Sequence, residues 1–182
     1  MNVFIGGSRA VSNLNATIRA RLDDLMKRGC TIFIGDANGA DKAVQGYLAK
    51  QQYPKVVVFC MEECRNNVGN WPTRQIAPPH ERRGGFSYYS AKDIVMSREA
   101  QCGVMLWDAK SKGTLQNMLN LVEAGKRTLV YFVPTKDFHV LANRDDLQTL
   151  FTRCDRRYLD SAARGLGLKS PLMQHHLQAP SQ

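Results

Sequence analysis

Several protein classes are excluded by what this sequence does not contain. Its 182 residues include no apolar run near the roughly 18–20 residues of a membrane-spanning helix. The opening residues MNVFIGG carry no charged region and cleavage site of a signal peptide. The Walker pattern G-x-x-x-x-G-K-[ST] is absent, which disfavours ATP hydrolysis, and the dinucleotide fingerprint G-x-G-x-x-G is missing as well. We therefore expect a cytoplasmic protein with no membrane partner.

Cysteine is scarce and odd in number. The five residues are Cys30, Cys60, Cys64, Cys102 and Cys154. Most lie in apolar runs, which fits reduced core thiols better than the disulfide framework of a secreted protein. Only Cys60 and Cys64 are close in sequence, His80 is too isolated to complete a zinc site, and no metal role is expected of His175 and His176. The sequence therefore predicts neither a metal site nor a cofactor.

The composition is that of an ordinary globular protein, with 43% hydrophobic and 23% charged residues. The length suits one domain. A net charge of +9 indicates an anionic partner, a nucleotide or a nucleic acid. Residues 1–133 hold 18 basic and 11 acidic side chains, against 7 and 5 in residues 134–182, so no basic tail carries the excess. This distribution favours charge gathered around a site on the main body.

Five short apolar runs, rich in β-branched and aromatic residues, predict strands buried on both faces of a parallel sheet. The runs are Asn2–Ile5, Thr31–Gly35, Lys55–Cys60, Gly103–Trp107 and Arg127–Val133. Helical periodicity separates most of them, which predicts an α/β, Rossmann-like, doubly wound sheet of about five strands with flanking helices over residues 1–133. Residues 61–90 form a long polar loop, suited to a lid, before a helix near Ser90. Residues 134–182 read as a helical or flexible C-terminal extension.

Two glycine turns follow predicted strands. Gly6, Gly7, Ser8 and Arg9 form the first, and Ser111, Lys112, Gly113 and Thr114 form the other. Glycine lets a ligand approach the backbone, and free amides at the next helix start favour an anion. One such turn is explained equally well by steric need, but two at the carboxyl edge of a sheet suit a phosphorylated sugar.

Polar residues in the other turns are candidates for sugar and base contacts. After the second strand, Asp36, Asn38, Gly39 and Asp41 are near enough to touch ribose hydroxyls, although turn formation and helix capping explain Asn38 and Asp41 equally well.

Further candidates follow the third and fourth strands. Asp108 ends the fourth strand, and Asp93 lies early in the preceding helix. Either carboxylate would bind ribose hydroxyls or stabilise the positive charge on a sugar whose N-glycosidic bond breaks. For Asp93, a helix-dipole partner in the first turn is the competing interpretation. Lys92, Arg65, Asn67 and Trp71 complete the predicted ligand set, and the aromatic cluster Phe86, Tyr88 and Tyr89 also offers stacking or packing.

These turns resemble a known superfamily. The segments GGSR, GDANGAD and WDAKSKGTLQN are similar to those of the SLOG superfamily, which joins DNA-processing protein A, the Lonely Guy phosphoribohydrolases and the molybdenum-cofactor carrier proteins. The resemblance covers residues 1–133. It implies a Rossmann-like fold, a nucleotide-type ligand between the two glycine turns, and a homo-oligomer, most often a dimer.

The phosphoribohydrolases carry the pattern P-G-G-x-G-T-x-x-E, whose glutamate is linked to catalysis together with an arginine. Aligning its G-T on Gly113 and Thr114 places Asn117 where that glutamate stands. An amide cannot accept a proton, so a hydrolase of this kind needs another acid. We expect Asp93 in that role, followed by Asp36 or Asp41, with Arg9 on the phosphate.

Three functions remain open from the sequence. The first is binding of a nucleotide or nucleotide-derived metabolite, as a sensor or as an N-glycosidic or phosphoribosyl hydrolase. The alternative is a single-stranded nucleic-acid-binding module, which the charge of +9 supports. The third is a partner-binding or structural domain whose site is vestigial.

Overall fold

A seven-stranded sheet with the order β4-β3-β2-β1-β5-β6-β7 forms the centre of the molecule. The computed structural model describes residues 1–77 and 85–165. The strands are β1 Asn2–Gly7, β2 Thr31–Gly35, β3 Val56–Cys60, β4 Thr73–Gln75, β5 Cys102–Trp107, β6 Thr128–Phe132 and β7 Asp137–Leu141. The helices are α1 Ala16–Lys27, α2 Ala40–Lys50, α3 Gly85–Glu99, α4 Lys112–Glu123, α5 Arg144–Phe151 and α6 Arg156–Gly165.

The predicted Rossmann-like arrangement is confirmed. All five predicted strands are present, and β3, β2, β1, β5 and β6 pair in parallel in that order. The chain first moves outward from β1 to β3 and then returns to place β5 on the other side of β1. Strand order therefore reverses between β1 and β5, and their carboxyl ends form the switch point where open α/β sheets bind ligands.

Two further strands lie at the edges, so the prediction of about five was low. β4 has three exposed residues, which no apolar run announces in the sequence. β7 pairs antiparallel with β6 and carries the sheet past Val133, where the predicted Rossmann-like part ends. Leu141 at the end of β7 and Leu147 and Leu150 of α5 are buried in the core.

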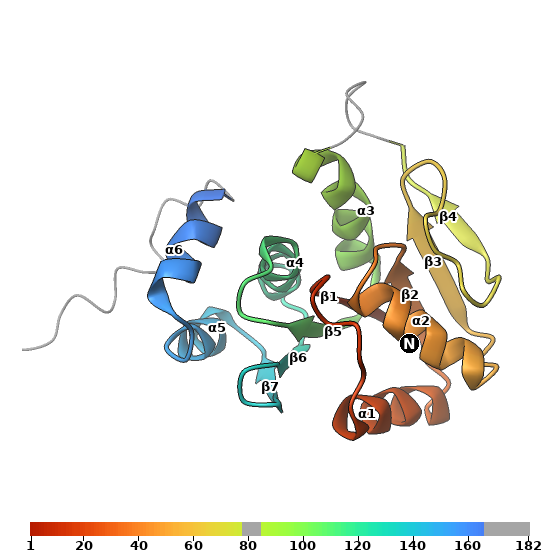
Figure 1. The fold of residues 1–182 in the computed structure, drawn as a ribbon, viewed down its shortest axis with the longest axis horizontal. Helices are drawn as coiled ribbons and strands as arrows, with labels where there is room; N and C mark the ends of the chain where they lie inside the picture. Colours follow the sequence, from red (N-terminus) through yellow and green to blue (C-terminus); the bar gives the residue numbers. More distant parts are fainter. Residues whose placement is uncertain (78–84, 166–182) are drawn as a thin grey trace, which may run out of the picture.

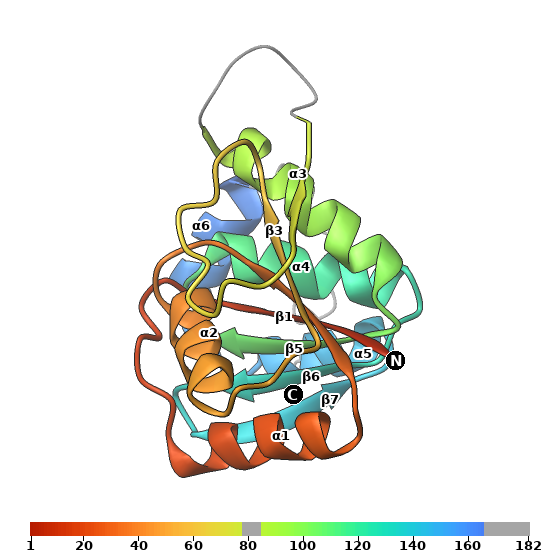
Figure 2. The ribbon, with the colours of Figure 1, turned by 90° about the vertical axis from the view of Figure 1, so that its right-hand side faces the viewer.

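Helices cover both faces of the sheet (Figures 1 and 2). Alternation along each strand sorts the apolar side chains, because successive residues point to opposite faces. Phe4, on one face of β1, belongs to the core that α3, α4 and α5 cover. Val3 and Ile5, on the other face, belong to the core covered by α1 and α2. These two cores fix the strand ends that carry the polar turns.

The segment 61–90 differs from the predicted loop. It contains β4, and α3 begins at Gly85 instead of near Ser90. Asp93 therefore lies in the third turn of α3, and its interpretation as a first-turn partner of the helix dipole is wrong. Residues 78–84, with His80, and residues 166–182, with His175 and His176, lie outside the described part of the chain.

Two cysteines also differ from expectation. Cys60 ends β3, and the turn that follows brings Cys64 to a Cα–Cα distance of 5.2 Å, where the two form a disulfide. The predicted reduced state is thus wrong for this pair. The turn brings the two cysteines close enough to bond, which their spacing in the sequence did not establish. Cys30, Cys102 and Cys154 are free thiols. Among the described residues, no helix combines the length and the apolar character needed to cross a bilayer.

Candidate functional site

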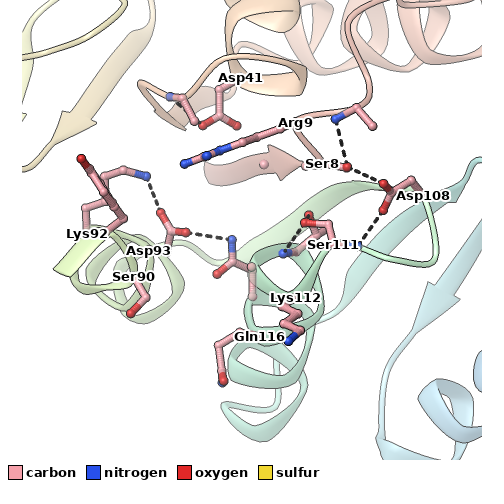
Figure 3. Close-up of a pocket in the computed structure, with 18 of the residues that line it drawn as sticks. Ser8, Arg9, Asp41, Ser90, Lys92, Asp93, Asp108, Ser111, Lys112 and Gln116 are labelled. Carbon is pink, nitrogen blue, oxygen red and sulfur yellow. Dashed lines mark hydrogen bonds and ion pairs between the residues drawn. The ribbon is translucent and has the colours of Figure 1, made fainter. Parts of the chain in front are cut away.

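A cavity of about 680 Å³ opens at the carboxyl ends of β1 and β5 (Figure 3). Its walls are the turn after β1, the start of α2, the inner side of α3, and the turn between β5 and α4. Both predicted glycine turns therefore face one hollow. Within it, the lining includes five basic side chains, Arg9, Arg65, Lys92, Lys110 and Lys112, and three acidic ones, Asp41, Asp93 and Asp108.

The first turn is held by close packing. A Cβ on Gly7 would lie 2.7 Å from both the Cβ of Ala40 and the carbonyl oxygen of Leu106, so glycine is required here for steric reasons. The carbonyl oxygen of Ser8 accepts hydrogen bonds from the amides of Val11 and Ala40. This rigid turn directs the exposed side chain of Arg9 across the cavity (Figure 3).

The second glycine turn is built around Asp108. One carboxylate oxygen accepts hydrogen bonds from the amides of Lys110 at 3.0 Å and Ser111 at 2.8 Å, and Ser111 caps α4. A Cβ on Gly113 would have no neighbour within 4 Å, in contrast to Gly7. Packing therefore does not demand glycine at position 113, and its small size leaves the start of α4 open to a ligand.

A chain of polar contacts crosses the cavity wall from α3 to α4. Lys92 Nζ lies 2.6 Å from Asp93 Oδ1, and Asn117 Nδ2 donates a 3.2 Å hydrogen bond to Asp93 Oδ2 (Figure 3). Lys92 is 3% exposed, so its charge is compensated by this contact rather than by water. Burial lowers the pKa of Lys92, but the nearby Asp93 and Asp41 outweigh it and leave that pKa above its ordinary value. Lys92 therefore remains an ammonium.

Asp41 lies near the start of α2, buried against the same lysine. Burial raises the pKa of Asp41 to about 7, despite the opposing attraction of Lys92. The amide of Ala37 donates a 3.3 Å hydrogen bond to Asp41 Oδ2. Asp41 and Asp93 thus differ in environment, since Asp93 has a direct ammonium partner and Asp41 is buried without one at that distance.

Arg65 and Tyr89 close the cavity on the side of β3. The Arg65 guanidinium binds Asp36 through Nε at 3.0 Å and Nη2 at 2.6 Å, and its carbon Cζ lies 4.6 Å from the centroid of the Tyr89 ring. Burial would raise the pKa of Asp36, but the hydrogen bonds from Arg65 hold it below its ordinary value. Asp36 thus holds the Arg65 guanidinium in the cavity wall without lining the cavity itself.

Most predicted site residues meet at this cavity. Those that line it are Gly6, Gly7, Ser8, Arg9, Asp41, Arg65, Lys92, Asp93, Asp108, Ser111, Lys112, Gly113, Thr114 and Asn117. Three predicted residues of the turn after β2 do not line the cavity. Asp36 lies behind Arg65, Asn38 is exposed and accepts a hydrogen bond from Asn66, and a Cβ on Gly39 would lie 2.3 Å from the carbonyl oxygen of Arg9.

Asn67 and Trp71 also lie away from the cavity. The side-chain amide of Asn67 hydrogen-bonds the main chain of Trp71. It accepts from the N–H of Trp71 and donates to the carbonyl oxygen of Trp71. The indole of Trp71 is 9% exposed and donates to the carbonyl of Tyr53. These contacts assign both residues to the packing of the loop between β3 and β4.

Tyr89 was predicted only within an aromatic cluster for stacking or packing, and sequence reasoning missed the lining residues Ser90, Lys110 and Gln116. Tyr89 and Ser90 precede Asp93 by four and three residues, the spacing of neighbours on one helix face. That spacing could have identified them had the helix been predicted to begin at Gly85. Gln116 precedes Asn117 on α4, and the periodicity of the helix gave no sign that both reach the cavity.

Comparison with other proteins gives no family. No protein-family model matches the chain, and no curated protein matches it at a significant level.

Proposed function

We propose that the protein binds a phosphorylated, nucleotide-type metabolite in this cavity and hydrolyses its N-glycosidic bond. The observation that carries the proposal is the meeting of the two glycine turns in one hollow at the strand-order switch. Open α/β sheets bind ligands at this position, and a cavity of about 680 Å³ is within the range of small-molecule sites.

The phosphate belongs at the start of α4. The amides of Lys112 and Gly113 are at the positive end of the helix, the open side of Gly113 permits close approach, and the Lys112 side chain adds charge. Arg9 approaches from the opposite turn (Figure 3). A phosphate held between them would leave the sugar over the polar wall formed by α3 and α4.

The hydrolytic step rests on Asp93. The resemblance to the phosphoribohydrolases places Asn117 where a catalytic glutamate stands, and the amide of Asn117 lies 3.2 Å from Asp93 Oδ2. The carboxylate absent from α4 is therefore supplied at nearly the same place by α3. A carboxylate there would stabilise the positive charge that develops on the sugar as the base departs.

Titration calorimetry with AMP, ADP-ribose and NAD tests binding. We expect heat from at least one of them with the wild type, unchanged in an Arg28→Ala variant, because Arg28 follows α1, pairs with Asp24 and does not line the cavity. Flat traces for all three ligands, with no shift in the melting temperature, would contradict the binding function.

Base release from AMP, GMP, CMP and UMP tests the reaction. Asp93→Asn should lower kcat at least 100-fold while changing Kd little, because the lost charge acts mainly in the transition state. Binding with no base release by the wild type would identify a sensor.

A single-stranded nucleic acid remains the second candidate, favoured by the net charge of +9. Phosphate contacts make such affinity fall log-linearly with salt concentration. Oligonucleotide binding with a steep salt dependence, together with no response to the mononucleotides, would favour this function over the first.

A further inference from the structure

The side chains of Asp41 and Lys92 both lie against Gly35, which has no side chain of its own. Gly35 ends β2, and a Cβ there would lie 2.5 Å from Asp41 Oδ2 and 2.8 Å from Lys92 Nζ. The space that an alanine would fill is therefore occupied by a carboxyl group from α2 and an ammonium group from α3. Glycine at this position allows both polar groups to reach the wall of the cavity.

The ammonium of Lys92 has two carboxylate neighbours but contacts one of them directly. It lies 2.6 Å from Asp93 Oδ1, whereas no hydrogen bond joins it to Asp41 within the described chain. Asp93 is further bound by Asn117, and its side chain is 19% exposed. Asp41 is 7% exposed, lines the cavity and accepts one amide hydrogen bond.

The charges around Asp41 come from every neighbouring element. Lys92 and Asp93 face it from α3, Asp36 from the end of β2 and Arg65 from the loop after β3. Arg9 extends below it from the first turn (Figure 3). Burial is the largest influence and raises the pKa of Asp41 to about 7, so the group is partly protonated at neutral pH.

We propose that Asp41 is the proton donor of the site and that Asp93 is the charge-stabilising carboxylate. This assignment deepens the proposed hydrolysis and rests on it. In glycoside hydrolysis, two carboxyl groups in one cavity take different roles because their environments differ. One keeps its proton and acts as the acid, and the other stays ionised.

The step balances with water alone. As the bond between the sugar C1′ and the base nitrogen breaks, its electron pair remains on the base, which takes the proton from the Asp41 carboxyl group. Asp93 faces the positive charge left on the sugar. A water molecule then bonds to C1′ and gives its proton to the Asp41 carboxylate, which restores the acid and yields the free base and the sugar phosphate.

The pH profile is the first test. With AMP, GMP, CMP or UMP as substrate, wild-type kcat should fall about tenfold per pH unit above about 7, where Asp41 loses its proton. Asp41→Asn should retain its nucleotide Kd within about threefold, release base at least 100-fold more slowly and lack this descending limb. Asp24→Asn, a change on α1 at a residue that does not line the cavity, should behave as the wild type.

A substrate that needs no acid separates the two carboxylates. The leaving group of 4-nitrophenyl β-D-ribofuranoside 5-phosphate departs as an anion, so Asp41→Asn should hydrolyse it within about fivefold of the wild-type rate. Asp93→Asn should be at least 100-fold slower on this substrate as well. Retention of full activity on nucleotides by Asp41→Asn, or equal losses on both substrates, would overturn the proposal.

The test also separates this inference from the function on which it rests. Nucleotide binding without base release by the wild type would overturn the role of Asp41 and leave the binding function standing. Absence of binding would overturn both. Equal melting temperatures of the wild type and Asp41→Asn at pH 7 would show that a kinetic loss is not a loss of fold.

Discussion

The hydroxyl of Ser8 donates a 2.7 Å hydrogen bond to Asp108 Oδ2, joining two turns that are 100 residues apart in the chain. Asp108 uses its other oxygen to accept from the amides of Lys110 and Ser111. One carboxylate thus fixes the first glycine turn against the start of α4. The two halves of the proposed phosphate site are held in register by a residue that need not touch the ligand.

Removing either end of this link should have unequal effects. Ser8→Ala removes the hydrogen bond to the carboxylate and a weaker one of 3.2 Å that the hydroxyl accepts from the amide of Ala10, and we expect it to lower the free energy of unfolding by about 1–2 kcal/mol. Asp108→Ala removes three, and the expected loss is about 2–4 kcal/mol. Urea unfolding measures both. Equal losses would show that the amide contacts of Asp108 contribute little.

Arg9 should act on the ligand and not on the fold. Its side chain is exposed and extends across the cavity, so Arg9→Ala should leave the melting temperature unchanged. Loss of a charged hydrogen bond to phosphate should weaken AMP binding by about 1–3 kcal/mol, measured by calorimetry. Unchanged affinity would mean that Arg9 makes no contact with the phosphate.

Gly113 offers a second change confined to the ligand. A Cβ at this position meets nothing within 4 Å, and alanine favours a helix by roughly 0.5–1 kcal/mol, so Gly113→Ala should preserve or raise stability. The added methyl group should nevertheless lower AMP affinity at least tenfold by blocking close approach to the helix start.

Gly46 in the middle of α2 provides the matched control. A Cβ there also meets nothing within 4 Å, but the residue does not line the cavity. Gly46→Ala should raise stability by a similar amount and leave affinity unchanged. If both variants bind AMP as the wild type does, the phosphate lies elsewhere.

Arg65→Ala should destabilise the protein in a pH-dependent way. Asp36 is 1% exposed, and without Arg65 it becomes a buried, unpaired charge at neutral pH. Since Arg65 itself is about one-third exposed, we expect a loss of about 1–3 kcal/mol at pH 7. Its hydrogen bonds depress the pKa of Asp36, so the stabilisation is present above the unfolded value of 3.8 and disappears as the pH falls below it.

Urea unfolding at pH 7 and at pH 3.5 measures this difference between wild type and variant, which should shrink at the lower pH. Arg74→Ala is the control, because both Arg74 and its partner Glu99 are exposed and the loss should be below about 1 kcal/mol. A constant difference for Arg65→Ala across this range would show that Asp36 is not its cause.

Asp41 should give the opposite dependence. Its pKa rises from 3.8 to about 7 on folding, so the native state binds the extra proton between these values, and stability falls as the pH rises through them. The slope is at most about 1.4 kcal/mol per pH unit for one group. The stability of the wild type relative to Asp41→Asn should therefore decline from pH 4.5 to pH 7 and level off above it.

The fold was largely predictable because apolar runs marked five of the six parallel strands. β4 was missed because Thr73 and its neighbours are exposed and polar, so this strand depends on pairing with β3 and not on burial. The start of α3 was placed too late because Gly85 and Ser87 weaken the helical pattern. That error in turn concealed the place of Ser90 in the cavity wall.

The site was predicted in part for a similar reason. Residues directly after β1 and β5 reach the cavity because the strands end there, and sequence position alone identifies them. After β2, however, Asp36 and Asn38 are turned toward the loop between β3 and β4, and only the tertiary contact with Arg65 and Asn66 shows this. The closeness of Asp93 to Asn117 likewise depends on the packing of α3 against α4.

The last described helix contacts one of the lysines that line the cavity. Lys110 Nζ lies 4.7 Å from the centroid of the Tyr158 ring on α6, and Leu159 anchors that helix in the core beside α4. Residues 1–133 alone would thus lack the aromatic support of one of the lysines around the opening. A shortened chain that ends at residue 133 would leave Lys110 free to take other positions, and affinities measured on it would not describe the chain that carries α6.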